Sequence, residues 1–257
     1  MDIPETLGMT VGMTACAPGA TDRHRTAQRC HTPQVPSPAL DDLLALYTQP
    51  RPSHPLQVEV CMVASIDGSI SIDGRSGALG TAADHQVLAT LRRAAGLVLV
   101  GAGTIRAESY GAVPEGITMA VVTRSGQLDP TSPVFRDGRA WAVAPESATL
   151  PDGIPALRCG KDTVDLADAV ARLHTIAPQA RFIHAEGGAI VNGALIAADL
   201  VDVINLSVSS HAVAGTGPRV ATHPAEVMHG FVPEHAVVHD AMVFTRWRRR
   251  REPAASS

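Results

Sequence analysis

The sequence predicts an α/β protein with a mixed, mostly parallel sheet flanked by helices and a C-terminal antiparallel strand pair. Two observations favour this class. Between residues 56 and 198, short runs of aliphatic and β-branched residues alternate with segments of helical periodicity, as in crossover units. The last third instead contains two strand-like stretches about a short turn at Asp240-Ala241. With 257 residues, 45% of them hydrophobic, the chain can bury one sizeable core or at most two small ones.

The chain begins with a segment that differs in composition from the rest. Residues 1–38 are rich in Gly, Pro, Thr, His and Arg, and we expect a poorly ordered extension there. A lead-in helix is predicted over 39–50, because its apolar residues follow the three-and-four spacing of an amphipathic helix: Leu40, Leu43, Leu44 and Tyr47. The run LQVEVCMVAS at 56–65, bounded by Pro55 and by Asp67-Gly68, predicts a buried strand.

The body of the chain, residues 55–248, is expected to form one domain. Thr81 and Asp84 have the spacing of an N-cap before a helix over 82–95. Further strands are predicted at 97–100, 117–123, 140–144, 181–185 and 202–213, and further helices at 166–176 and 189–198. We assign 249–257 to a solvated tail, because one short basic run in an acidic chain is weak evidence for nucleic acid.

Composition argues against several classes of function. A formal net charge of −4 and an aromatic content of 3% disfavour nucleic-acid binding, which needs cations and stacking platforms. The sequence shows neither an apolar run long enough to span a membrane nor a secretory signal, so we expect a cytoplasmic protein without membrane contact. The four cysteines form no CxxC pair, so we predict neither a metal site nor a disulfide framework.

Four short polar or glycine-containing segments each follow a predicted strand. They are ASIDGSISIDG at 64–74, LVLVGAGTIRAE at 97–108, VVTRSG at 121–126 and FIHAEGGAIVNGALI at 182–196. In open α/β sheets, ligands bind at the carboxyl ends of the strands, where backbone N–H groups and helix N-termini converge. The common position of these segments therefore predicts one ligand site.

Each segment also has a purely structural interpretation. Asp-Gly turns account for both glycines of the first segment, but not for Asp67 immediately after a buried strand. In the second, Arg106 stands where a Rossmann fingerprint has its third glycine, so the Rossmann interpretation is weak. Thr104 at an expected helix start and Arg106 could still meet an anionic group. In the last, Glu186 ends a strand and two glycines permit either a tight turn or a phosphate at a helix N-terminus.

Together, SIDG at 65–68, VGAGTIRAE at 100–108, VTRSG at 122–126 and AEGGAIVNGAL at 185–195 resemble the riboflavin-biosynthesis pyrimidine reductases, the RibD C-terminal family. The resemblance covers about residues 55–248. It implies a dihydrofolate-reductase-like fold, a homodimer and NADPH as the hydride donor. It also implies a phosphoribosylamino-pyrimidine substrate whose ribose is reduced to a ribityl chain.

The resemblance carries over to individual residues. It implies that eight residues bind the cofactor: Gly101, Gly103, Thr104, Thr123, Arg124, Ser125, Gly187 and Gly188. Among these, the Thr-Arg-Ser triplet would face the adenosine 2′-phosphate that separates NADP from NAD. Substrate binding is implied for Ser65, Asp67, Arg92 and Arg106, with Asp67 and Glu186 as catalytic carboxylates that orient the ring or relay a proton.

One position departs from the family pattern. Many members carry Lys directly after SxDG, whereas this chain has Ser69, and Lys161 is its only lysine. A pterin-like substrate such as dihydrofolate, or a non-catalytic NADP-binding module, therefore stays open beside the riboflavin-pathway substrate. The sequence has no H-x-E…P-C-x-x-C zinc deaminase pattern, so we expect a stand-alone reductase.

Overall fold

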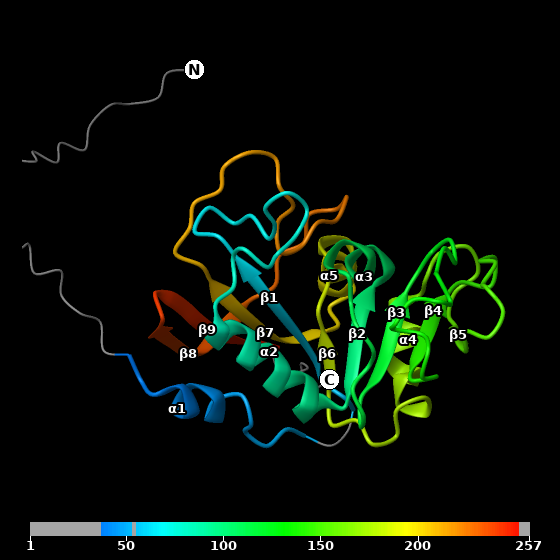
Figure 1. The fold of residues 1–257 in the computed structure, drawn as a ribbon, viewed down its shortest axis with the longest axis horizontal. Helices are drawn as coiled ribbons and strands as arrows, with labels where there is room; N and C mark the ends of the chain where they lie inside the picture. The colour runs from blue at the N-terminus through cyan, green and yellow to red at the C-terminus, as the bar shows by residue number, and fades with distance from the viewer. Residues whose placement is uncertain (1–36, 53–54, 252–257) are drawn as a thin grey trace, which may run out of the picture. The chain divides into compact units, whose positions relative to one another are not determined.

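One nine-stranded sheet organises the part of the chain that the computed structural model describes, residues 37–52 and 55–251 (Figure 1). The strand order is β5-β4-β3-β2-β6-β1-β7-β9-β8. The predicted extension over 1–38 lies outside the described residues, apart from its last two. None of the described helices is long and apolar enough to cross a membrane.

The first seven strands of the chain run parallel and the last two are antiparallel, which confirms the predicted fold class. The parallel strands are β1 (Val58–Ala64), β2 (Leu97–Gly101), β3 (Thr118–Val122), β4 (Ala140–Ala144), β5 (Ala156–Arg158), β6 (Ile183–Ala185) and β7 (Val201–Val208). The antiparallel pair is β8 (Phe231–His239) and β9 (Met242–Arg249). The turn between them has positive φ at Asp240 and Ala241, as a two-residue type I′ hairpin turn requires.

Helices cover both faces of this sheet. They are α1 (Leu40–Ala45), α2 (Ala82–Ala95), α3 (Ala102–Glu108), α4 (Leu166–Arg172), which a 3-10 turn over Leu173–Thr175 extends, and α5 (Ala189–Ala197). In β2, alternate side chains point to opposite faces: Leu99 packs in the core under α4 and α5, while Val98 packs in the core under α3. Because both faces are buried there, β2, β3 and β4 are nearly continuous apolar runs.

Helix α2 lies across the middle of the sheet and forms as its sequence predicts (Figure 1). The Thr81 hydroxyl accepts a hydrogen bond from the Asp84 N–H at 3.4 Å, and the helix ends at Gly96 with φ of 72°. Its apolar face packs against Phe182 and Phe244 and against α1, whose Leu43 is fully buried. Helix α1 ends at Ala45, before the end of the predicted 39–50 segment.

Candidate active site

A cavity of about 1170 Å³ opens at the carboxyl ends of β1, β2, β3 and β6. All four sequence segments reach it. The end of β2 and the start of α3 contribute Gly101–Thr104, the loop after β3 contributes Arg124, and the segment after β6 contributes Glu186 and Gly188. The segment after β1 contributes Ile70, Ser71 and Gly74. The volume exceeds the range of about 300–1,000 Å³ usual for a single small ligand. It offers room for a dinucleotide and a second molecule.

Glycines shape one end of this cavity. A Cβ built on Gly103 would meet no atom within 4 Å, so the backbone there is open to a ligand. The Gly101 N–H donates to the Gly187 carbonyl at 2.6 Å, and a Cβ on Gly188 would lie 2.9 Å from Thr104 Oγ1. Gly188 caps α5 without a side-chain hydrogen bond, so the first-turn N–H groups of this helix keep no side-chain partner at the cap. These features suit a phosphate group.

The predicted Thr-Arg-Ser triplet after β3 divides in the structure. Arg124 is exposed and lines the cavity, whereas Thr123 and Ser125 do not line it. Thr123 is buried, and its hydroxyl accepts a hydrogen bond from the Gly126 N–H at 3.1 Å. Gly126 has φ of 76°, and a Cβ there would lie 1.9 Å from the Thr149 carbonyl oxygen. Much of this motif therefore meets the demands of a tight turn.

Glu186 is the most strongly bound carboxylate of the site. Arg92 on α2 holds it with two hydrogen bonds, Nε to Oε1 at 2.5 Å and Nη2 to Oε2 at 2.6 Å. The Tyr110 hydroxyl donates to Oε2 at 2.5 Å. His184 Nε2 lies 3.2 Å from Oε1, outside hydrogen-bond geometry. Burial alone would raise the pKa of Glu186, but the Arg92 guanidinium and His184 hold that pKa well below its usual range.

Asp67, by contrast, is exposed and does not line the cavity. Its Oδ1 accepts hydrogen bonds from the Ser65 hydroxyl at 2.5 Å and from the Val213 N–H at 3.0 Å, and Oδ2 accepts one from the Ala214 N–H at 2.6 Å. These hydrogen bonds, the one from Ser65 foremost, lower the pKa of Asp67 to about 2. The Ser65–Asp67 pair therefore ties the loop after β1 to the loop after β7.

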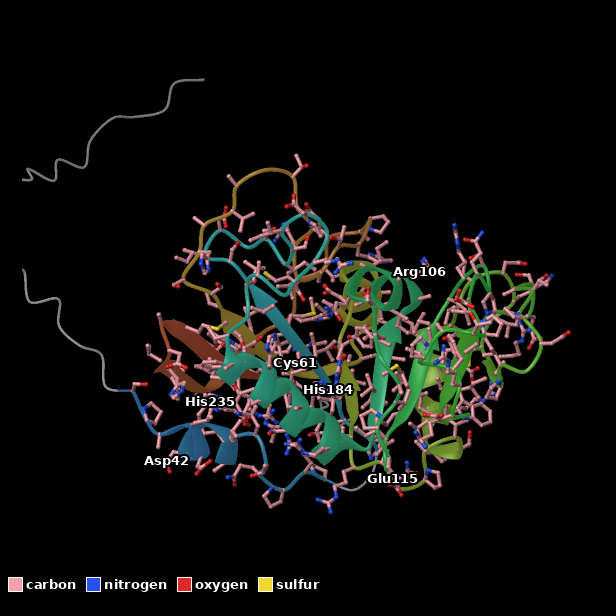
Figure 2. All side chains as sticks on the ribbon, viewed as in Figure 1. Asp42, Cys61, Arg106, Glu115, His184 and His235 are labelled. Atoms are coloured by element: carbon pink, nitrogen blue, oxygen red, sulfur yellow. The ribbon has the colours of Figure 1, made fainter. Side chains whose placement is uncertain are left out.

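Two other positions that the sequence places beside the substrate are not part of the cavity wall. Ser69, at the position of the family lysine, is buried, and its hydroxyl donates to the Ser71 carbonyl at 2.9 Å. Arg106 on α3 is exposed and donates to the Gln127 carbonyl at 3.1 Å (Figure 2). Of the four predicted substrate-binding residues, the structure thus places Arg92 alone in the cavity wall.

The cavity wall also contains polar residues that the sequence does not predict for the site, among them Asp84, His85, Tyr110 and Arg219. Asp84 and His85 belong to the first turn of α2, where a carboxylate is explained as a helix-capping residue. Tyr110 follows α3 and Arg219 lies in the loop after β7, and neither belongs to a recognisable motif. Only the folded arrangement of the loops brings these residues to the site.

Comparisons with solved structures give the same fold at low sequence identity. A pyrimidine reductase-like protein of Corynebacterium diphtheriae matches at 20% identity with a TM-score of 0.67, over 77% of this chain and 93% of that one. The riboflavin biosynthesis reductase of Saccharomyces cerevisiae matches at 16% identity with a TM-score of 0.61, over 82% of this chain and 99% of the yeast chain.

A diaminohydroxyphosphoribosylaminopyrimidine deaminase/5-amino-6-(5-phosphoribosylamino)uracil reductase of Thermotoga maritima matches at 20% identity with a TM-score of 0.61. That match covers 76% of this chain and 57% of the Thermotoga chain. No curated protein sequence matches the chain. The model of the RibD C-terminal domain family matches residues 57–228, which is more than half of the chain. The chain therefore belongs to the RibD C-terminal domain family of oxidoreductases.

Proposed function

We propose that the protein is an NADPH-dependent reductase of a phosphoribosylamino-pyrimidine, in which the ribose is reduced to a ribityl chain. The observation that carries this proposal is the large cavity, whose wall holds Gly101, Gly103 and Gly188, here called the glycine-lined end, and Arg92, Tyr110 and Glu186, here called the polar end. The family match supports a reductase of the riboflavin pathway, and the Thermotoga relative is named for 5-amino-6-(5-phosphoribosylamino)uracil.

The glycine-lined end fits a pyridine dinucleotide. Gly103 leaves the backbone open, the N-terminus of α5 faces the cavity at Gly188, and Arg124 offers a guanidinium for a phosphate. When bound, NADPH supplies the hydride. Because Arg124 lines the cavity and Thr123 and Ser125 do not, we assign discrimination between NADPH and NADH to Arg124.

At the polar end, we assign Glu186 to positioning rather than to proton transfer. A carboxylate has about four acceptor sites, and Arg92 and Tyr110 occupy three of those on Glu186 while His184 lies beside a fourth. Its lowered pKa also keeps it ionised near neutral pH. Glu186 therefore holds the Arg92 guanidinium in place. The Arg92 side chain is 28% exposed and presents its positive charge to the substrate. This arrangement orients an anionic or polar substrate group.

A reductase of a pterin-like compound such as dihydrofolate is the second candidate. It is favoured by Ser69, which is buried and places no cation in the cavity where many relatives carry Lys. A panel that contains 5-amino-6-(5-phosphoribosylamino)uracil and dihydrofolate separates the two candidates by loss of NADPH absorbance. Cofactor binding without turnover of either compound would instead support a non-catalytic module.

The cofactor assignment is tested with Gly103→Ala. In the helix, alanine is more favourable than glycine by about 1 kcal/mol, so the variant should be at least as stable as the wild type. Its methyl group enters the open space beside Gly103, and we expect NADPH to bind at least about tenfold more weakly, since each tenfold costs about 1.4 kcal/mol. Gly111→Ala, also in open space but outside the cavity, is the matched control. Unchanged NADPH affinity in Gly103→Ala would refute the assignment.

The choice between NADPH and NADH is tested with Arg124→Ala. We expect the wild type to bind NADPH more tightly than NADH, and the variant to lose most of that difference because the phosphate loses its guanidinium. Titration by nucleotide fluorescence measures both affinities. Arg136→Ala removes another exposed arginine, outside the cavity wall, and should leave the preference intact. Equal affinity of the wild type for both cofactors would contradict the role of Arg124.

A further inference from the structure

Asp84 is a carboxylate in the cavity wall that forms no ion pair with any of the described residues. It lies in the first turn of α2, and a Cβ built on Gly80 would be 2.9 Å from its Oδ2 and 3.3 Å from His85 Nε2. Within the described part of the chain, no Arg, Lys or His nitrogen lies within 4 Å of the Asp84 oxygens. Partial removal of an unpaired charge from water costs free energy, so the presence of an unpaired carboxylate at position 84 calls for an explanation.

Helix capping does not supply that explanation. The Asp84 backbone N–H bonds to the Thr81 hydroxyl, but among the described residues the carboxylate makes no return bond to the Thr81 N–H, as a capping box would require. Asp168 occupies the equivalent position in α4, where its N–H bonds to the capping Asp165. Asp168 is 39% exposed and pairs with Arg172 at 2.7 Å. Asp84 has the same place in its helix without such a partner.

The surroundings of Asp84 leave its charge only lightly compensated. Burial raises the pKa of Asp84, and the Ser207 hydroxyl on β7 and His85 on α2 only partly oppose that rise. Among the described residues, the other titratable neighbours are the Cys61 thiol on β1 and the Tyr47 hydroxyl just after α1, both of which Asp84 influences electrostatically. Neither carries a positive charge. Asp84 therefore remains a basic hydrogen-bond acceptor at the cavity wall.

The other carboxylates of the site are already engaged. Glu186 is bound by Arg92 and Tyr110, and Glu108 accepts the Ser76 N–H at 2.8 Å. Asp67 lies outside the cavity wall. A ligand that brings N–H groups into the cavity therefore finds at Asp84 a carboxylate that no described residue pairs with.

We propose that Asp84 is a substrate-binding residue that accepts hydrogen bonds from N–H groups on the ring of a nitrogen heterocycle. This inference rests on the proposed function and deepens it. It assigns the recognition of the ring to α2, whereas the sequence motifs assign it to Asp67 and Glu186. It also requires a substrate whose ring edge donates hydrogen bonds.

The test compares Asp84→Asn with Asp168→Asn in the full chain. Asn keeps the shape but replaces one acceptor oxygen by a donor. For Asp84→Asn we expect about a 10- to 100-fold rise in KM for the reduced substrate, and NADPH affinity within about twofold of the wild type. The thermal midpoint should be unchanged or higher, because an uncompensated charge is removed. Asp168→Asn should leave KM unchanged.

The outcomes separate the two proposals. Calorimetric titration of 5-amino-6-(5-phosphoribosylamino)uracil and of dihydrofolate is run beside turnover. Wild-type turnover with an unchanged KM in Asp84→Asn, or a KM rise that tracks a lower thermal midpoint, would overturn the role of Asp84 alone. If the wild type binds one of these compounds without turning it over, and Asp84→Asn abolishes that binding, the role of Asp84 is supported and the proposed reductase activity is overturned. A wild type that binds neither compound would overturn both.

Discussion

At the scale of single residues, the ion pair between Arg92 and Glu186 sets the character of the polar end. The Glu186 side chain is 3% exposed and that of Arg92 is 28% exposed, so the pair is only partly screened by water. The Arg92 guanidinium also lies 5.2 Å from the centre of the Tyr110 ring. Removing one member of a buried pair costs about 3–5 kcal/mol, and the exposed part of Arg92 reduces that cost here.

We therefore expect Glu186→Gln to lower the free energy of unfolding by roughly 2 kcal/mol and turnover at least about tenfold, because Arg92 is no longer held. Tyr110→Phe removes one hydrogen bond and keeps the ion pair, so it should cost about 1 kcal/mol. Urea unfolding and NADPH oxidation measure the two effects. Wild-type turnover in Glu186→Gln would exclude the carboxylate from the working site.

At the scale of elements, the loops after β1 and β7 form one structure at the rim of the cavity. Besides the Asp67 hydrogen bonds, the Ile66 N–H donates to the His211 carbonyl at 2.8 Å and the Ile70 N–H to the Pro218 carbonyl at 3.0 Å. The second loop contributes residues 216–219 to the cavity wall. Asp67 thus helps to position the loop after β7, which forms part of the cavity wall.

Asp67→Asn tests this coupling. An amide keeps one acceptor oxygen, so at least one of the Val213 and Ala214 N–H bonds is lost. We expect faster hydrogen exchange at these two amides and a severalfold rise in KM for the substrate. The thermal midpoint should barely move because the carboxylate is exposed. Asp73→Asn, in the same loop and exposed, serves as the control. Unchanged exchange at both amides would contradict the role of Asp67 as a loop tie.

Elements with strong local signals are those that the sequence predicts best. The helix at 82–95 and the strand at 140–144 match α2 and β4, because a cap, a terminal glycine and flanking turns mark their ends. Strand β5 has three residues, too few for a periodic signal, and was not predicted. The strand predicted over 202–213 ends at Val208, since the chain beyond it turns away to meet Asp67.

At the scale of the whole molecule, the sequence predicts where the site lies better than which side chains face it. The parallel order of strands brings the loops after β1, β2, β3 and β6 to one edge, as the topology rule anticipates. Side-chain direction depends instead on contacts between loops. Thr123 accepts a hydrogen bond from the Gly126 N–H within its own turn, and Asp67 accepts one from the Val213 N–H in the loop after β7. NADPH, the exact substrate and the homodimer stay predictions.

The fold also has a buried charge cluster that joins distant parts of the chain. Glu59 on β1 is fully buried and accepts hydrogen bonds from Arg51, at 2.9 and 3.2 Å, and from Arg246 on β9, at 2.9 and 3.0 Å. Arg246 Nη1 also donates to Asn205 Oδ1 on β7 at 2.8 Å. One carboxylate therefore connects the segment after α1, the centre of the sheet and its antiparallel end.

This cluster predicts a specific acid sensitivity. Burial alone would raise the pKa of Glu59, but hydrogen bonds and charge from Arg246 and Arg51 lower it from 4.5 to about 2. A lowered folded-state pKa means that the stabilisation is complete above about pH 4.5 and is lost as the pH falls toward 2. At about 1.4 kcal/mol per pH unit, Glu59 contributes roughly 3 kcal/mol.

Urea unfolding of the wild type and of Glu59→Gln across this range isolates the Glu59 contribution. The variant should be the less stable protein at neutral pH, because two arginines lose their partner, and the difference from the wild type should shrink as the pH falls. Glu115→Gln, at an exposed position, should follow the wild type (Figure 2). A difference between wild type and Glu59→Gln that stays constant with pH would show that folding does not lower the pKa of Glu59, and would contradict the contribution of its charge to stability.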